Sequence, residues 1–133
     1  MSNYIYEQLA EALDKLPNGF PRTPSNVEIR ILKRIFQPEE ASIASRLDGT
    51  AESPDVLAKR IGLSVEDAEE KLMKMAKRGL LWTEEVNGKS SFRLAPFVVG
   101  IYESQLETMD HELAHMMEEY LANGGAIGTM KPQ

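Results

Sequence analysis

The residues best suited to chemistry are two histidines in the segment His111-Glu112-Leu113-Ala114-His115, which matches the zinc-protease pattern H-E-x-x-H. On a helix this spacing would turn both imidazoles toward one metal ion, with Glu112 as the general base over a zinc-bound water. A third ligand is needed, yet no H-x-x-G-x-x-H extension follows. The apolar spacing of the surrounding helix places Leu113 in the core and both histidines on the solvent-facing side. We therefore predict a solvated helix face and no metal site.

Other catalytic patterns are missing from the sequence. The 133 residues include no cysteine, which excludes thiolate nucleophiles, disulfides and cysteine-ligated zinc or iron–sulfur clusters in this chain. No glycine-rich phosphate loop and no G-x-S-x-G motif occurs. We expect a protein that is not an enzyme and that holds no cofactor in this chain. The lack of cysteine, of a signal peptide and of a membrane-length apolar run favours the cytoplasm and no membrane contact.

Residues 53–94 follow the order of elements of a winged helix-turn-helix. Ser53 and Pro54 begin a first helix, which meets a tight turn at Gly62. Ser64 begins a second helix, which ends at Gly79. The residues expected to face the core from these two helices are Val56, Leu57, Ile61, Val65, Ala68, Leu72, Met75 and Ala76.

A β-hairpin is predicted after the second helix. The strand-like runs 80–83 and 91–94 flank an Asn87-Gly88 turn, which is a strong hairpin signal. Trp82 and Phe92 on these strands are expected to pack toward the core rather than to stack on bases. The predicted fold class is therefore mostly α with a small β-hairpin wing, a winged helix-turn-helix with helical extensions at both ends.

The charge of the second helix conflicts with DNA binding. This helix would enter the major groove of DNA, yet its first turns carry Glu66, Asp67, Glu69 and Glu70, which phosphate repels. The chain has a net charge of −6, and residues 53–94 hold 8 basic against 7 acidic side chains, so no concentrated basic face is expected. A dimeric DNA-binding regulator is the alternative function, for which the contact residues would be Lys59, Arg60, Lys71, Lys74, Lys89 and Arg93.

The flanking segments divide the chain into four parts. Residues 1–24 are expected to form an N-terminal helix (about 4–16) and a Pro/Gly loop, in which Phe20 anchors to the core. Residues 25–94 form the winged-helix core, and its first helix follows an apparent capping box of Ser25 and Glu28. A long C-terminal helix (95–122) and a flexible tail (123–133) complete the chain.

The predicted C-terminal helix carries a heptad stripe that requires a helical partner. The stripe either docks on the same chain or pairs with a second copy in a homodimer, and the sequence leaves both open. As the interaction residues we predict Tyr102, Leu106, Met109, Leu113, Met116 and Tyr120.

Three stretches resemble one protein family: 16–23 (LPNGFPRT), 27–36 (VEIRILKRIF) and 94–103 (LAPFVVGIYE). They are similar to the N-terminal winged-helix region of bacterial and archaeal four-iron–four-sulfur (4Fe-4S) ferredoxin-type proteins, in which a cysteine-rich, cluster-binding segment follows. The resemblance implies an accessory domain that positions or pairs a redox protein, so the partner would be its own ferredoxin region or another protein. It also implies that any clusters lie in a region beyond Gln133.

Overall fold

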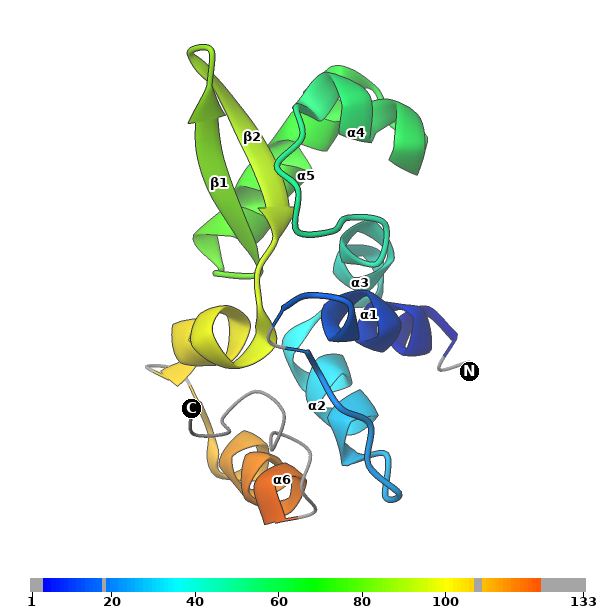
Figure 1. Cartoon of the computed structure of the whole chain (residues 1–133), viewed down its shortest axis with the longest axis vertical. Helices are drawn as coiled ribbons and strands as arrows, with labels where there is room; N and C mark the ends of the chain where they lie inside the picture. The colour runs from blue at the N-terminus through cyan, green and yellow to red at the C-terminus, as the bar shows by residue number, and fades with distance from the viewer. Residues whose placement is uncertain (1–3, 18, 107–108, 123–133) are drawn as a thin grey trace.

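The computed structural model describes residues 4–17, 19–106 and 109–122 (Figure 1). Within these ranges the chain is mostly helical and contains one two-stranded antiparallel sheet. This agrees with the predicted combination of helices and a small hairpin. The tail predicted for residues 123–133 lies outside the described residues.

Helices α4 (Pro54–Ile61) and α5 (Val65–Lys77) pack against each other. The hydroxyl groups of Ser53 and Ser64 each accept a backbone N–H from the first turn of the following helix, at 3.5 and 3.1 Å. Gly62 ends α4 at a φ of 79°, a left-handed conformation that glycine adopts without strain. The starts and stops of both helices are therefore those that the sequence predicts.

The hairpin consists of β1 (Leu81–Val86) and β2 (Lys89–Leu94), paired in register along their whole length. Asn87 and Gly88 connect them with φ values of 54° and 78°. Positive φ at both positions is what a two-residue type I′ turn requires, and it matches the twist of the strands. The predicted Asn-Gly hairpin is confirmed.

The chain that leads into α4 lies along the outer edge of β2. Phe92 donates its N–H to the carbonyl of Glu52 at 2.8 Å and accepts the N–H of Glu52 at 3.0 Å. Further along the same edge, Leu94 donates its N–H to the carbonyl of Asp48 at 2.8 Å. Phe92 is fully buried, so its predicted packing toward the core is confirmed.

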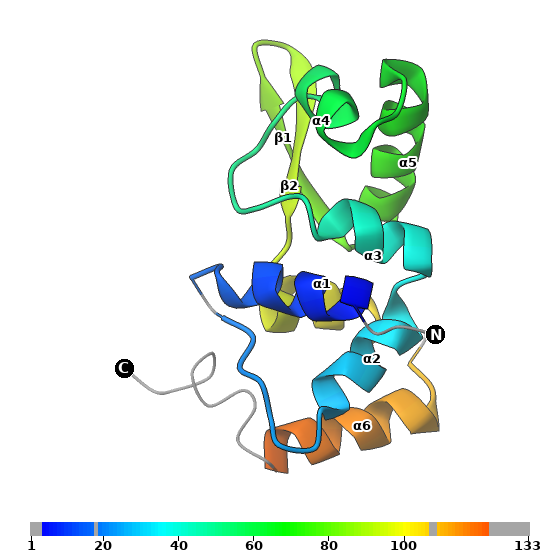
Figure 2. The same cartoon turned by 90° about the vertical axis from the view of Figure 1, so that its right-hand side faces the viewer.

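Three helices precede this unit: α1 (Tyr4–Asp14), α2 (Val27–Ile35) and α3 (Pro38–Ala44). Helix α1 packs against both α2 and α3, and Figure 2 shows α3 between α1 and the α4–α5 pair. Pro38 begins α3 as predicted, and Glu40 accepts the backbone N–H of Gln37 at 2.9 Å. A carboxylate thus reaches back to the residue before the helix, in the manner of a capping box.

The capping box predicted at Ser25 and Glu28 is wrong. Asn26, with a φ of 59°, occupies the position before α2, and its side chain caps no backbone group. Ser25 Oγ does accept the N–H of Val27 at 3.4 Å, but the carboxylate of Glu28 reaches past the first residues of the helix into the preceding loop. Its carboxylate instead binds Thr23, because that side chain is buried and finds its donors in the preceding loop.

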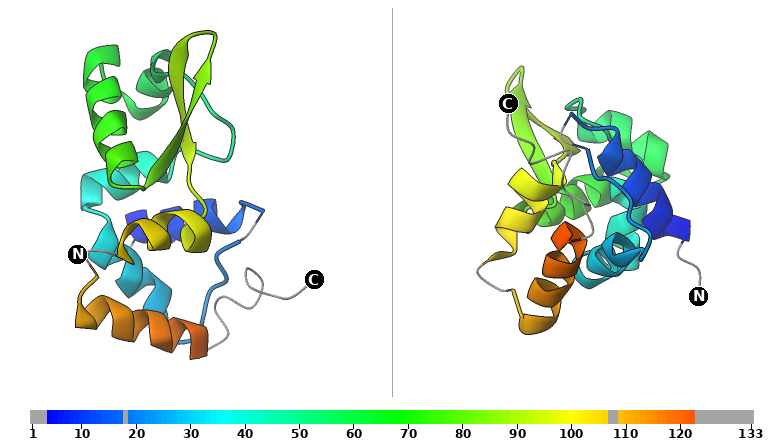
Figure 3. Two further views of the ribbon diagram at one scale, coloured as in Figure 1. Left: turned by 90° about the vertical axis from the view of Figure 1, so that its left-hand side faces the viewer. Right: turned by 60° about the horizontal axis from the view of Figure 1, so that its bottom comes forward.

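The single long helix predicted for residues 95–122 is also wrong. The segment contains a π-helix, η1 (Phe97–Tyr102), and a separate helix, α6 (His111–Ala122). Asp110 begins α6 as an N-cap, since its carboxylate accepts the N–H of Leu113 at 2.9 Å. This new start lets α6 take its own direction and pack against α2, which Figure 3 shows from two further sides.

Helix η1 brings the chain back against the hairpin. The N–H of Ile101 bonds the carbonyl of Pro96 at 2.9 Å, five residues earlier, which is the π-helical pattern. A Cβ at Gly100 would lie 3.1 Å from both the Cβ of Ala95 and the ring atom Cζ2 of Trp82. Glycine at this position therefore allows η1 to approach the hairpin closely.

One hydrophobic core extends through both ends of the elongated molecule. At one end lie α4, α5 and the hairpin, and at the other lie α1, α2, η1 and α6 (Figure 1). Phe20 is 1% exposed and its ring centroid lies 4.6 Å from that of Phe97, so its predicted role as a core anchor is confirmed. Among the described helices, none combines the length and apolar character needed to cross a membrane.

Candidate functional site

The N-terminal half of α5 presents carboxylates to solvent. Glu66, Asp67, Glu69 and Glu70 are all exposed. Carboxylates in the first turn of a helix are stabilised by the partial positive charge of its free N–H groups, which accounts for Glu66 and Asp67. The surface where a DNA-reading helix would carry donors for base edges therefore carries acceptors. Of these four carboxylates, Glu70 is paired with Lys74.

Most of the basic residues predicted as DNA contacts are already engaged by carboxylates of the same chain. The ion pairs, with their N···O distances, are Arg60–Glu52 at 2.6 Å, Lys71–Glu39 at 3.1 Å, Lys74–Glu70 at 3.6 Å and Arg93–Glu84 at 2.7 Å. The hydrogen bonds that Arg60 donates to the carboxylate of Glu52 raise the pKa of Arg60 above its ordinary value. Lys59 and Lys89 are exposed and form no ion pair within the part of the chain that the structure describes.

Arg93 makes a second contact that holds it on the hairpin. Its guanidinium carbon lies 4.6 Å from the centroid of the Trp82 ring, on the neighbouring strand directly opposite. This cation–π contact and the ion pair with Glu84 fix both the charge and the apolar stem of Arg93 along the sheet. Arg93 is therefore occupied within the hairpin, and Trp82 is covered by it.

A groove lies between the first turns of α4, the first turns of α5 and the tip of the hairpin, at the top of Figure 1. We call it the hairpin groove. It has a volume of about 910 Å³ and is lined by residues 51–56 and 86–91 together with Val65 and Glu69.

Three valines from three different elements line this groove and remain exposed. Val56 of α4, Val65 of α5 and Val86 of β1 have exposed fractions of 47%, 40% and 45%. Val56 and Val65 were predicted to face the core, and this is wrong. The adjacent residue on α4, Leu57, is fully buried, so the inward side of this helix is centred on Leu57 and not on Val56.

The H-E-x-x-H segment lies on α6 with both histidines exposed, as the apolar spacing predicted. Glu112, the candidate general base, forms an ion pair with Arg34 at 3.2 Å. His115 lies 3.9 Å from Glu118 and its side chain is 82% exposed. Among the described residues, no group of three or more histidine, aspartate or glutamate side chains is arranged to hold a metal ion.

The predicted heptad stripe is divided by the break between η1 and α6. Leu113, Met116 and Tyr120 are buried, because α6 packs on α2 of the same chain. Of the remaining stripe residues, Leu106 is 54% exposed, while Tyr102 and Met109 are half-buried. The stripe therefore forms no continuous outward face in this structure, and its α6 part follows the same-chain alternative.

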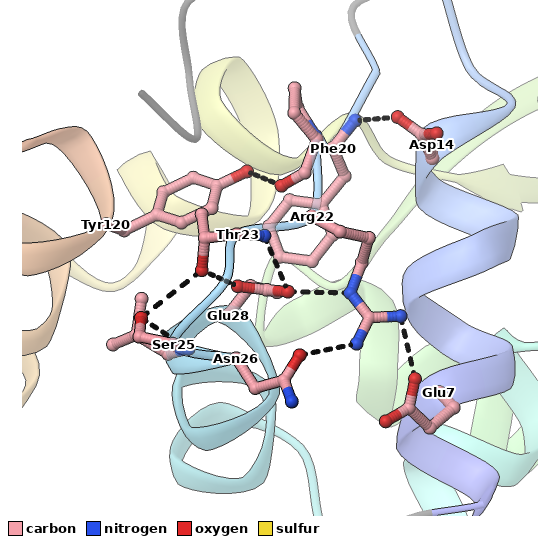
Figure 4. Close-up of polar contacts among 11 residues, drawn as sticks. Glu7, Asp14, Phe20, Arg22, Thr23, Ser25, Asn26, Glu28 and Tyr120 are labelled. Carbon is pink, nitrogen blue, oxygen red and sulfur yellow. Dashed lines mark hydrogen bonds and ion pairs between the residues drawn. The ribbon is translucent and has the colours of Figure 1, made fainter. Parts of the chain in front are cut away.

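A polar network around a buried carboxylate was not anticipated from the sequence (Figure 4). Glu28 is fully buried and accepts hydrogen bonds from the hydroxyl of Thr23 at 2.6 Å, the N–H of Thr23 at 3.1 Å and Nε of Arg22 at 2.6 Å. Arg22 also reaches Glu7 on α1 at 2.7 Å and the side-chain oxygen of Asn26 at 3.0 Å. The network joins the loop before α2 to both α1 and α2.

The pKa of Glu28 reflects two opposing effects. Burial by itself raises the pKa of this carboxyl, while the hydrogen bonds from Thr23 and Arg22 lower it. The hydrogen bonds outweigh burial, and the pKa of Glu28 lies below the ordinary value for glutamate. Because all the donors come from the chain itself, this carboxylate serves to hold the loop in place.

The three stretches that carry the family resemblance meet in this region. Phe20, in the first stretch, contacts Phe97, in the third, and Arg22 bonds Glu28, in the second. The hydroxyl of Tyr120 donates to the carbonyl of Pro21 at 2.8 Å, and closes the same loop from α6. The three stretches therefore contribute to the packing of the fold, and none of their residues lines the hairpin groove.

Comparisons of the chain with known protein families, with curated proteins and with solved structures find no match.

Proposed function

We propose that this chain is a non-catalytic winged-helix module of the cytoplasm that binds protein, and that it serves a 4Fe-4S ferredoxin-type protein as an accessory domain. The winged-helix assignment is supported by the order of α4, the Gly62 turn, α5 and the hairpin, and by the bridge from Glu52 to the outer edge of β2. The absence of cysteine agrees with a reducing compartment.

The observation that carries the proposal is the charge of the surface that would face DNA. Helix α5 exposes carboxylates in its first turns, and four of the six basic residues that could contact phosphate are in ion pairs within the chain. DNA affinity depends on cations that can neutralise phosphates and release their counterions. A surface of carboxylates and exposed valines is better suited to a protein partner.

The iron–sulfur part of the proposal depends on the resemblance of residues 16–23, 27–36 and 94–103. A chain without cysteine can contribute no thiolate ligand to a cluster. Its role would be to position the cluster-bearing protein through surface contacts, while electron transfer takes place in that partner.

A titration with duplex DNA tests the choice of protein over DNA. We expect no binding to a fluorescent duplex of about 25 base pairs, at either about 25 mM or about 150 mM salt, because few free cations face it. Fluorescence anisotropy measures the binding. DNA binding that weakens steeply with salt and is lost in Lys59→Ala/Lys89→Ala, but kept in Lys15→Ala/Lys77→Ala, would contradict the proposal.

The iron–sulfur assignment is tested on the protein as it occurs in its own cells. An antibody against this chain is used to purify it, and the iron, the acid-labile sulfide and the intact mass of the purified material are measured. We expect iron and sulfide to accompany the chain, either in the same polypeptide or in a bound partner. Iron-free material would overturn this part of the proposal and leave the protein-binding part to be judged by the DNA titration.

A further inference from the structure

The hairpin groove contains an unpaired segment of strand edge. In an antiparallel pair, successive residues of a strand direct their backbone N–H and C=O groups to alternate sides. Phe92 and Leu94 bond to Glu52 and Asp48, away from β1. Ser90 has the same parity, so its N–H and C=O also point away from β1.

At Ser90 this edge opens into the groove. The chain that bridges β2 at Glu52 turns into α4 at Pro54 and does not continue alongside Ser90, which lines the groove and is exposed. No backbone group in the described ranges bonds to Ser90 from this side. An exposed edge with free N–H and C=O groups can accept one more extended segment.

The apolar part of the groove lies next to this open edge. Val56, Val65 and Val86 approach it from α4, α5 and β1, so that apolar side chains of an added segment would meet apolar surface on more than one side. Single exposed apolar residues are ordinary, but three that converge in one concave surface mark an interaction site.

The charged residues of the groove are mostly acidic. Asp55 and Glu69 line it, are exposed, and form no ion pair with any other described residue. Glu52 also lines it but is bound to Arg60. Lys89 supplies a positive charge near the hairpin turn. Two free carboxylates against one free ammonium group favour an occupant that carries basic side chains.

We propose that the hairpin groove binds an extended segment of a partner protein in which apolar and basic residues alternate. The segment adds to the edge of β2 at Ser90, its apolar side chains contact Val56, Val65 and Val86, and its basic side chains meet Asp55 and Glu69. This inference rests on the proposed protein-binding function and specifies the chemistry of the partner.

The test uses fluorescent seven-residue peptides and the full chain. The probe Lys-Val-Lys-Val-Lys-Val-Lys is compared with a peptide in which glutamate replaces lysine, and with one in which proline replaces the central valine. We expect only the first to bind, with chemical-shift changes centred on the amide of Ser90 in a ¹H–¹⁵N spectrum. Equal binding of the proline peptide, which lacks the central N–H, would overturn strand addition.

Matched variants distinguish the groove from general attraction to an acidic protein. Glu69→Lys is expected to weaken binding of the lysine peptide by about tenfold or more, because it places like charges together. Glu66→Lys makes the same charge change on the same helix outside the groove, and is expected to retain most of the affinity. Equal losses in the two variants would overturn the groove assignment.

A further variant, Val56→Ser/Val86→Ser, tests the apolar contact separately. Both side chains are about half exposed, so we expect folding to be preserved, as judged by circular dichroism, and binding of the lysine peptide to be lost. Unchanged binding would overturn the inference. If neither peptide nor DNA binds the native chain, the groove assignment fails while the proposed function stands; if DNA binds and displaces the peptide, the proposed function itself fails.

Discussion

Glu28 is a buried carboxylate that accepts hydrogen bonds from Arg22 and Thr23, in the loop that precedes its own helix. Removing a carboxylate from water costs free energy. Its hydrogen bonds offset that cost only when their donors are held in place. Thr23 is itself buried, and Arg22 is tied to Glu7 on α1. The position of the loop before α2 thus depends on the negative charge of Glu28 as well as on packing.

We predict that Glu28→Gln lowers the free energy of unfolding by about 1–2 kcal/mol at pH 7, because hydrogen bonds to a charged acceptor are stronger than those to a neutral one. The amide can keep the same partners, so the fold is retained. Urea unfolding followed by circular dichroism measures the change. Glu11→Gln, at an exposed position of α1, is the control, and an equal effect of the two substitutions would contradict the prediction.

The pH dependence of this difference has a definite sign. Since the pKa of Glu28 is lower in the folded state than in the unfolded chain, its contribution is fully present above the unfolded value, about 4.3 for a free glutamate. It is lost as the pH falls through the lower, folded value. The stability difference between the native chain and Glu28→Gln should therefore be constant from pH 7 to about pH 5 and shrink below about pH 4.3.

At the scale of single elements, local rules predict helix starts and turns well. Serine caps, Pro at the first helical position and the Asn-Gly turn act through backbone geometry that is fixed by a few adjacent residues. The break before α6 was missed because the apolar stripe is compatible with one continuous helix, and only Asp110 signals a new start. The apolar stripe favours one continuous helix, and Asp110 favours a new start. The packing of α6 on α2 decides between them.

The same limit explains the errors at Glu28 and at the hairpin groove. A glutamate three residues after a serine satisfies the capping-box pattern, but the buried donors of Thr23 decide where it points. Val56 and Val65 satisfy helical spacing, but the packing of α4 against α5 leaves both side chains exposed. The sequence shows that apolar residues recur at helical spacing. Only the folded structure shows which of them are buried.

Asp110 offers a test at the scale of one helix. We predict that Asp110→Ala destabilises the protein by about 1–2 kcal/mol, because it removes both the N-cap of α6 and an ion pair with Arg34. Asp110→Asn retains a capping oxygen and should lose about half as much or less. Hydrogen exchange at the amide of Leu113, which bonds the cap, should accelerate in the alanine variant only. Identical exchange in both variants would show that the cap does not hold the start of α6.

At the scale of the whole molecule, the two ends share one hydrophobic core. The contact of α1 with α3 joins them on one side, and the close approach of Gly100 to Trp82 joins them on the other. A continuous core of this kind predicts that the ends unfold together rather than in sequence.

The chain has a single tryptophan, Trp82, which lies in the hairpin far along the sequence from Glu28. We predict that its fluorescence and the helical circular dichroism signal change at the same urea concentration, and that Glu28→Gln shifts both midpoints equally. Such coincidence is the mark of a two-state transition. A shift of the circular dichroism midpoint alone would show that the two ends are independent folding units.

The contact between α6 and the N-terminal part of the chain bears on folding during synthesis. Tyr120 donates to the carbonyl of Pro21, 99 residues earlier, and Arg30 pairs with Glu119, 89 residues later. A ribosome that adds about 5–20 residues per second needs several seconds to cover that distance. Helix α2 therefore leaves the exit tunnel before α6 can cover its apolar side. Helices α4 and α5 and the hairpin, which are close in sequence, can form their mutual contacts before α6 is made. The N-terminal end of this protein is made first and closed last.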